Sequence, residues 1–216
     1  MIINATFSLF LAIVVAYLLG SIPFAYVFTR LFSGKDIRKL GSGNGGAHNV
    51  FREVGLKAAI PVAIFDVGKG TLAVFIAYGL LSVPIKEPNV FVLLAALAAI
   101  AGHMWSAYLK LRGGNGLSVT VGALALLMPW ELLIAFGLLL ILVVITRNLV
   151  LATNLGLLTV PISSRFIDKS WPLVIFSIIV ALMLIAHFIP TARVALSKAG
   201  NRKKLTDELF RRHSDE

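Results

Sequence analysis

The sequence predicts an all-α integral membrane protein, a bundle of seven transmembrane helices with the N-terminus outside and the C-terminus in the cytoplasm. Hydrophobic residues make up 58% of the 216 residues, and the mean hydropathy is +0.92, well above that of soluble domains. Long apolar blocks and a one-sided distribution of basic residues complete the prediction. The chain has no cysteine, so disulfides and thiolate chemistry are excluded.

The apolar blocks set the number of spans. A tilted helix of about 20–25 residues crosses a bilayer, and the first block has neither the basic n-region nor the cleavage site of a signal peptide. The block 117–146 is longer than one span needs and is interrupted by Met128-Pro129, so it is either one kinked helix or two short spans. The other blocks are 5–32, 57–82, 89–109, 148–164 and 171–190.

The basic residues distinguish these alternatives. If the long block is two spans, sixteen of the 20 Lys and Arg residues fall on one side, only Lys86, Arg165 and Lys169 on the other, and Lys69 lies within a span. The positive-inside rule then gives seven spans. We expect a membrane domain over residues 1–195 and a basic cytoplasmic tail over 196–216. The net charge of +10 favours binding to anionic lipid headgroups and phosphorylated metabolites. A nucleic-acid partner is not expected, because the sequence contains no basic soluble domain.

Two glycine-rich segments, Gly41–Gly46 and Gly113–Gly116, interrupt this apolar chain, and basic residues flank both. Glycine permits positive φ and lets the backbone approach a ligand closely. Successive backbone N–H groups beside an Arg or Lys form a phosphate cradle. Because both segments are predicted in cytoplasmic loops, the sequence indicates that a phosphorylated small molecule is handled at the lipid surface.

The first segment continues into a predicted short helix from about Ala47 to Val54, which Gly55 ends. His48, Asn49 and Arg52 lie three or four residues apart and are expected on one face. Arg52 would then grip a phosphate, with Ser42 and Asn44 in the glycine turn as orienting groups. The alternative is a flexible linker with a solvated helix. His48 and Glu53 are five residues apart and point in different directions, so we do not treat them as a catalytic pair.

Ionisable residues inside apolar spans are costly and usually paired. Asp66 and Lys69 are three residues apart, which permits an ion pair or a role in a site. His103, near the end of its span, is read as a packing residue. Gly20-Ser21-Ile22-Pro23 is read as a helix kink, because proline frees backbone groups. Asp66 and Lys69 are also too few to favour a transporter for a phosphorylated solute, which ranks last among the alternatives.

Taken together, these segments resemble the bacterial acyl-phosphate:glycerol-3-phosphate acyltransferase family (PlsY) over about residues 10–195. This resemblance implies a seven-span enzyme of the bacterial inner membrane, working among membrane lipids. Such an enzyme transfers a fatty acyl group from acyl phosphate to glycerol-3-phosphate and forms lysophosphatidic acid for phospholipid synthesis. No metal or organic cofactor is expected. The matching residues are Gly20–Pro23, Asp36–Lys39, Gly41–Asn44, Asn49 with Arg52, Asp66 with Lys69-Gly70, Gly102-His103 and Gly113–Gly116.

The resemblance also implies residue roles. Three positions depart from the family pattern: Asn115 replaces a phosphate-binding lysine, His48 a threonine, and Pro190 an asparagine that follows a histidine matched by His187. A non-catalytic or substrate-shifted paralogue that binds phospholipid precursors is therefore the alternative function. The expected catalytic residues are Ser42, Asn49, Arg52 and His187. The expected substrate- and phosphate-binding residues are Arg38, Gly41, Gly43, Asn44, His48, Gly113, Gly114, Asn115 and Gly116.

Overall fold

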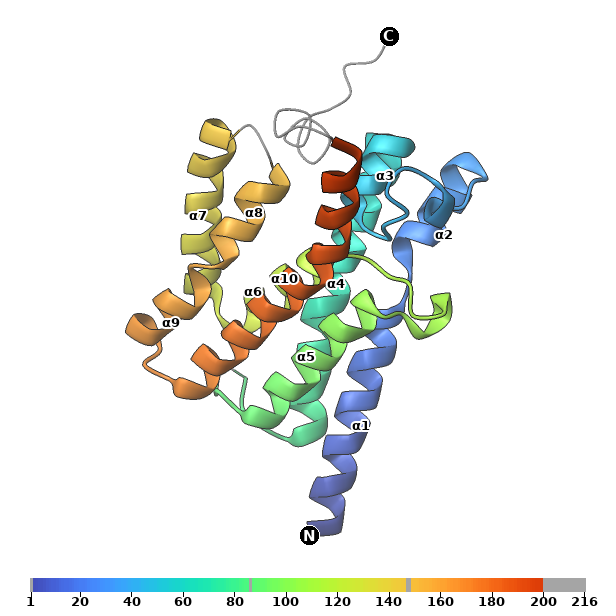
Figure 1. The fold of residues 1–216 in the computed structure, drawn as a ribbon. Helices are drawn as coiled ribbons and strands as arrows, with labels where there is room; N and C mark the ends of the chain where they lie inside the picture. The colour runs from blue at the N-terminus through green and yellow to red at the C-terminus, as the bar shows by residue number, and fades with distance from the viewer. Residues whose placement is uncertain (1, 86, 147–148, 200–216) are drawn as a thin grey trace. The chain divides into compact units, whose positions relative to one another are not determined.

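The structure is a computed structural model that describes residues 2–85, 87–146 and 149–199. Within these residues the regular elements are all helices, and no strand is present (Figure 1). The all-α prediction is therefore confirmed. The chain forms two compact units, Met1–Pro129 and Trp130–Glu216, which are described separately below.

The first unit carries both glycine-rich segments. Helix α1 packs against both α4 and α5, and α6 packs against α4. Small residues allow the close approach: a Cβ on Gly20 would overlap the backbone of Ala99. The α-helices of this unit are α1 (Ile2–Ser21), α2 (Phe24–Ser33), α3 (Ala47–Glu53), α4 (Leu56–Leu81), α5 (Val90–Met104) and α6 (Leu117–Leu127), with short 3₁₀ turns η1 (Ile37–Lys39) and η2 (Ala107–Leu109).

Two proline positions divide apolar blocks of the sequence, and the kink predicted at Gly20–Pro23 is a break between two helices. Helix α1 ends at Ser21, and α2 begins after Pro23, whose nitrogen carries no hydrogen to continue the helical ladder. Helix α6 ends at Leu127, and α7 begins at Pro129, the position at which proline is best tolerated. The block 117–146 is therefore two helices.

In the second unit, α9 packs against α10, and the guanidinium of Arg165 lies 5.1 Å from the ring centroid of Trp171. The block 148–164, expected as one span, is instead divided at a turn at Leu158–Thr159. The reason is Pro161 in the first turn of α9, which cannot donate to a preceding helical carbonyl. The helices are α7 (Pro129–Thr146), α8 (Leu149–Leu157), α9 (Val160–Ile167) and α10 (Trp171–Ala199).

Among the residues that the structure describes, three helical segments are long and apolar enough to cross a membrane: Ala5–Ser33, Leu56–Leu81 and Val90–Leu109. The first of these includes the break between α1 and α2. Shorter apolar helices are Leu117–Leu127, Pro129–Ile145, Leu155–Ile167 and Trp171–His187. These segments make the chain a helical membrane protein, whereas seven crossings and the sidedness of the termini stay predictions.

Candidate functional site

The two glycine-rich segments meet in space. The backbone N–H of Gly45 donates to the carbonyl of Gly113 at 3.1 Å. Gly41 and Gly43 have φ values of 51° and 70°, as expected for a glycine turn. The sequence indicated two phosphate-binding loops but gave no sign that they touch, and their hydrogen bond makes them one candidate site.

Asn49 organises the first loop. Its side chain is buried, with an exposed fraction of 4%. Its Oδ1 accepts from the Ser42 N–H at 3.3 Å, and its Nδ2 donates to the carbonyls of Leu40 and Asn44 at 3.2 and 3.0 Å. These three bonds hold the glycine turn against α3. The predicted helix over 47–54 is confirmed, with Gly55 following it at a φ of 112°.

His48 and Arg52 lie on the exposed part of α3, whereas Asn49 faces the loop. Of the three residues expected on one face of this helix, Asn49 is thus buried, whereas the other two are exposed. Partial desolvation, followed in size by the positive charge of Arg52, lowers the pKa of His48. His48 is accordingly neutral at pH 7, and Arg52 is the cation of this helix face. No salt bridge joins Arg52 to a carboxylate in the part of the chain that the structure describes.

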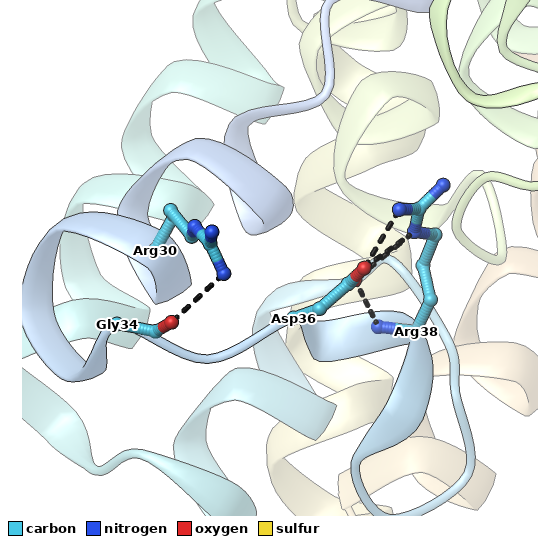
Figure 2. A network of polar contacts seen from close by, with 4 residues as sticks. All are labelled: Arg30, Gly34, Asp36 and Arg38. Carbon is cyan, nitrogen blue, oxygen red and sulfur yellow. Dashed lines mark hydrogen bonds and ion pairs between the residues drawn. The ribbon is translucent and has the colours of Figure 1, made fainter.

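Arg38, another predicted phosphate-binding residue, is already paired (Figure 2). Its Nη2 lies 2.6 Å from Asp36 Oδ2, its Nε lies 3.0 Å from Asp36 Oδ1, and its guanidinium lies 5.1 Å from the ring centroid of Tyr26. The hydrogen bond from the Arg38 side chain is the main reason why the pKa of Asp36 falls to about 2. Nearby, Arg30 donates to the carbonyl of Gly34 at 2.9 Å. The positive charge of Arg38 is therefore balanced by Asp36.

The second loop is anchored through its backbone to the end of α5. The N–H groups of Gly113 and Gly114 donate to the carbonyls of Met104 and His103 at 3.1 and 3.0 Å. A Cβ on Gly113 would overlap both of those carbonyl oxygens, so only glycine fits there. Asn115 is partly exposed and directly precedes Gly116, the N-cap of α6. The loop thus presents Asn115 beside the N–H groups that begin α6.

A small pocket lies in this region of the first unit, and its lining includes Ser21, Gly45, Asp66, Lys69, His103 and Gly114. Asp66 Oδ1 lies 2.7 Å from Lys69 Nζ, which confirms the predicted proximity of this pair, and 3.7 Å from His103 Nδ1. Sequence reasoning treated His103 only as a packing residue. A useful signal would have been that it is a third ionisable residue in the apolar spans of the same unit.

Two predicted positions belong to the second unit. His187 belongs to α10 in the second unit, so its predicted role stays a prediction. The side chain of Pro190 lies outside what the structure describes.

The comparisons with known proteins agree with the motifs. A family model described as glycerol-3-phosphate acyltransferase matches residues 10–196. Glycerol-3-phosphate acyltransferase 1 of Dehalococcoides mccartyi is 38% identical over 207 residues, which cover 94% of this chain and 98% of that protein. Glycerol-3-phosphate acyltransferase 2 of Moorella thermoacetica is 40% identical over 195 residues, covering 90% of this chain and 96% of that protein.

Solved structures are similar over nearly the same length. The crystal structure of PlsY (YgiH), an integral membrane glycerol 3-phosphate acyltransferase, in its glycerol 3-phosphate form has a TM-score of 0.79 and 27% sequence identity. The superposed region covers 88% of this chain and 93% of the PlsY chain. The lysophosphatidic acid form gives a TM-score of 0.77 at 26% identity, with the same coverage. The family predicted from the motifs is thus confirmed, and the chain belongs to the glycerol-3-phosphate acyltransferase family.

Proposed function

We propose that this protein is a membrane acyltransferase that moves a fatty acyl group from acyl phosphate to the sn-1 hydroxyl of glycerol-3-phosphate. The products are lysophosphatidic acid, a phospholipid precursor, and inorganic phosphate. The observation that carries the proposal is the hydrogen bond between Gly45 and Gly113, which joins two amide-rich loops into one site. The names of the relatives and of the PlsY structures support the acceptor and the product.

The reaction needs little covalent help from the protein. The acceptor hydroxyl attacks the acyl carbonyl carbon, the bond from that carbon to the phosphate oxygen breaks, and the departing phosphate can take up the hydroxyl proton. Because inorganic phosphate is a good leaving group, no acyl-enzyme is required. Catalysis then consists mainly of positioning the two substrates and stabilising the charge that develops between them.

In this proposal, the first loop and α3 supply the positive charge that binds a substrate phosphate. Arg52 is the exposed cation of α3 and makes a charge-assisted hydrogen bond to a substrate phosphate. The exposed hydroxyl of Ser42 donates to the same group, while Asn49 holds the Ser42 backbone in place. Gly41, Gly43 and Asn44 shape the turn, and neutral His48 borders it.

The second loop lines the other side of the substrates. Asn115, with the amides of Gly113–Gly116, donates neutral hydrogen bonds to the second phosphate. His187 orients the acceptor or assists proton transfer, and the acyl chain lies between helices toward the lipid. No step of this reaction calls for a metal or an organic cofactor.

The proposed setting is a bacterial inner membrane crossed seven times, with the N-terminus outside. The partition of basic loop residues, sixteen against three, supports this topology. Single cysteines introduced as Lys86→Cys and Lys203→Cys test it cleanly, since the chain has none of its own. A membrane-impermeant thiol reagent is expected to label them from opposite sides, and labelling of both from one side would contradict seven spans.

The activity test uses the purified protein in lipid nanodiscs with palmitoyl phosphate and glycerol-3-phosphate. We expect lysophosphatidic acid by mass spectrometry and one phosphate released for each molecule formed. A parallel reaction with a palmitoyl thioester tests the donor, because the proposal requires acyl phosphate to be used in preference. No product with either donor would overturn the proposed activity and favour a binding-only paralogue.

A further inference from the structure

We propose that Asp66 and Lys69 are positioning residues that hold the two glycine-rich loops in register for the acyl transfer. The inference rests on the proposed function for its catalytic consequence, whereas the structural anchor stands by itself. Neither residue is assigned a contact with substrate. Their action passes through the break between α1 and α2, and through the end of α5.

Lys69 holds the helix break. Its Nζ donates to the carbonyl of Ile22 at 2.7 Å and lies 2.7 Å from Asp66 Oδ1. Ile22 directly precedes Pro23, where the helical hydrogen-bond ladder between α1 and α2 is interrupted. The ammonium thus ties a backbone group of the break to α4, and the ring of Phe24, 5.5 Å away, covers it.

The second link leads to the glycine-rich loops. His103 Nδ1 lies 3.7 Å from Asp66 Oδ1, and the carbonyl of the same histidine accepts from the Gly114 N–H at 3.0 Å. A Cβ on Gly114 would overlap the His103 imidazole, so that ring lies directly against the loop. Gly113 in turn accepts from Gly45 in the first loop.

A third contact joins the helix break to the segment that enters the second loop. Ser106 Oγ donates to the carbonyl of Ser21 at 2.6 Å, and the Ala107 N–H donates to Ser21 Oγ at 3.3 Å. The same stretch of backbone is therefore held from α4 by Lys69 and from the start of η2 by Ser106. Loss of the ion pair would therefore disturb both the helix break at Ile22 and the end of α5, which holds Gly114.

Burial argues for a role beyond packing. The exposed fractions are 1% for Asp66 and 4% for Lys69. An apolar pair of similar size would often stabilise such a site as well or better, because two buried charges must first be removed from water. An apolar pair could not, however, donate to the Ile22 carbonyl or place a carboxylate beside the His103 ring. Catalytic groups must be held to within a fraction of an ångström, which is what these polar contacts provide.

The test compares Lys69→Met, the double variant Asp66→Asn with Lys69→Met, and the matched control Lys57→Met on the exposed start of the same helix. Lys69→Met alone leaves a buried carboxylate without its cation, so failure to fold is an acceptable result for that variant. The double variant removes both charges and is expected to fold, with a thermal midpoint in detergent near that of the wild type.

Two measurements are made on the folded proteins. The double variant is expected to lower kcat/KM for glycerol-3-phosphate by about tenfold or more, with KM raised, because its loops no longer hold the phosphate groups in register. Hydrogen exchange of the Gly45 amide is expected to accelerate in the double variant and to stay unchanged in Lys57→Met. A purely structural ion pair would show neither effect once folding is restored.

The outcomes separate this inference from the proposed function. Wild-type exchange at Gly45 together with wild-type kcat/KM in the double variant would overturn the positioning role. A wild-type protein that makes no lysophosphatidic acid would overturn the acyl-transfer activity, and accelerated exchange in the double variant would still support the anchor.

Discussion

The two glycine-rich loops are held in place by different means. A side chain holds the first loop, since Asn49 makes three hydrogen bonds to the backbone of Leu40, Ser42 and Asn44. Backbone groups hold the second loop, since Gly113 and Gly114 donate to carbonyls at the end of α5. The conformation of the first loop therefore depends on the side-chain amide of Asn49. The conformation of the second loop would instead be disturbed by a methyl group added at Gly113.

Two arginines near the first loop, Arg38 and Arg52, also differ in how they are held. Arg38 is held by Asp36 and Tyr26, whereas Arg52 stands exposed on α3 without a salt bridge among the described residues. The sequence did not distinguish these two arginines, because it predicts a phosphate-binding role for both. The free energy of binding a phosphate is larger for a cation that has no carboxylate to give up, so Arg52 is the stronger candidate.

The largest effect is expected from Gly113→Ala. The added Cβ would overlap the carbonyl oxygens of His103 and Met104, which are backbone atoms that cannot rotate away. The second loop would leave α5 and lose its bond to Gly45, and we expect acyl transfer to fall below detection. Gly68→Ala is the control, because its Cβ meets nothing within 4 Å. Normal turnover by Gly113→Ala would mean that the loop geometry is not needed.

Arg52→Ala should reduce kcat/KM by about 10²–10³, the usual cost of removing a donor to developing charge. The protein should remain folded in the membrane, because Arg52 is exposed on a short loop helix. Arg30→Ala, which removes a cation that donates to the Gly34 carbonyl in its own segment, is the matched control. Equal losses in the two variants would show a general effect of positive charge and not a specific grip on phosphate.

Asn49→Ala tests the side-chain support of the first loop. The variant leaves the Ser42 N–H and two carbonyls without the Asn49 amide as their partner. We therefore expect the free energy of unfolding to fall by about 1–3 kcal/mol. Thermal unfolding in detergent measures this change. Activity should fall mainly through a raised KM, since Ser42 loses its position. An unchanged thermal midpoint would show that the glycine turn holds itself without the amide.

The smallest effect is expected from Asn115→Lys, which adds a charge to an otherwise complete loop. A cation opposite a phosphate should raise kcat/KM for glycerol-3-phosphate by roughly tenfold, equivalent to about 1.4 kcal/mol. Steady-state kinetics with acyl phosphate in excess provide the comparison, with Asn115→Gln as a neutral control of similar length. A rate below that of the wild type would indicate a site adapted to a different acceptor.

Local rules of the chain were sufficient for much of the fold. Hydropathy predicted helices, Pro23 predicted a kink, Pro129 an interruption of the long block, and Gly55 the end of α3, because each depends on backbone chemistry within a few residues. The spacing of Asp66 and Lys69 permitted an ion pair or a role in a site, and the structure contains the ion pair. Hydropathy alone predicts one span over the block 148–164, whereas Pro161 divides it into two helices.

Tertiary structure decided what the site contains. The sequence by itself determined an all-helical membrane chain, two glycine-rich loops and the residue types of a phosphate site. It did not determine that Gly45 meets Gly113, that Asn49 faces inward, that Asp36 holds Arg38, or that His103 lies beside Asp66. The contacts of Gly45 with Gly113 and of His103 with Asp66 join residues far apart in the sequence, so they depend on how the helices pack, which is set by the summed burial of many small contacts. The Asp36–Arg38 pair is local, two residues apart, but the residue types alone did not show whether Arg38 binds that carboxylate or a phosphate.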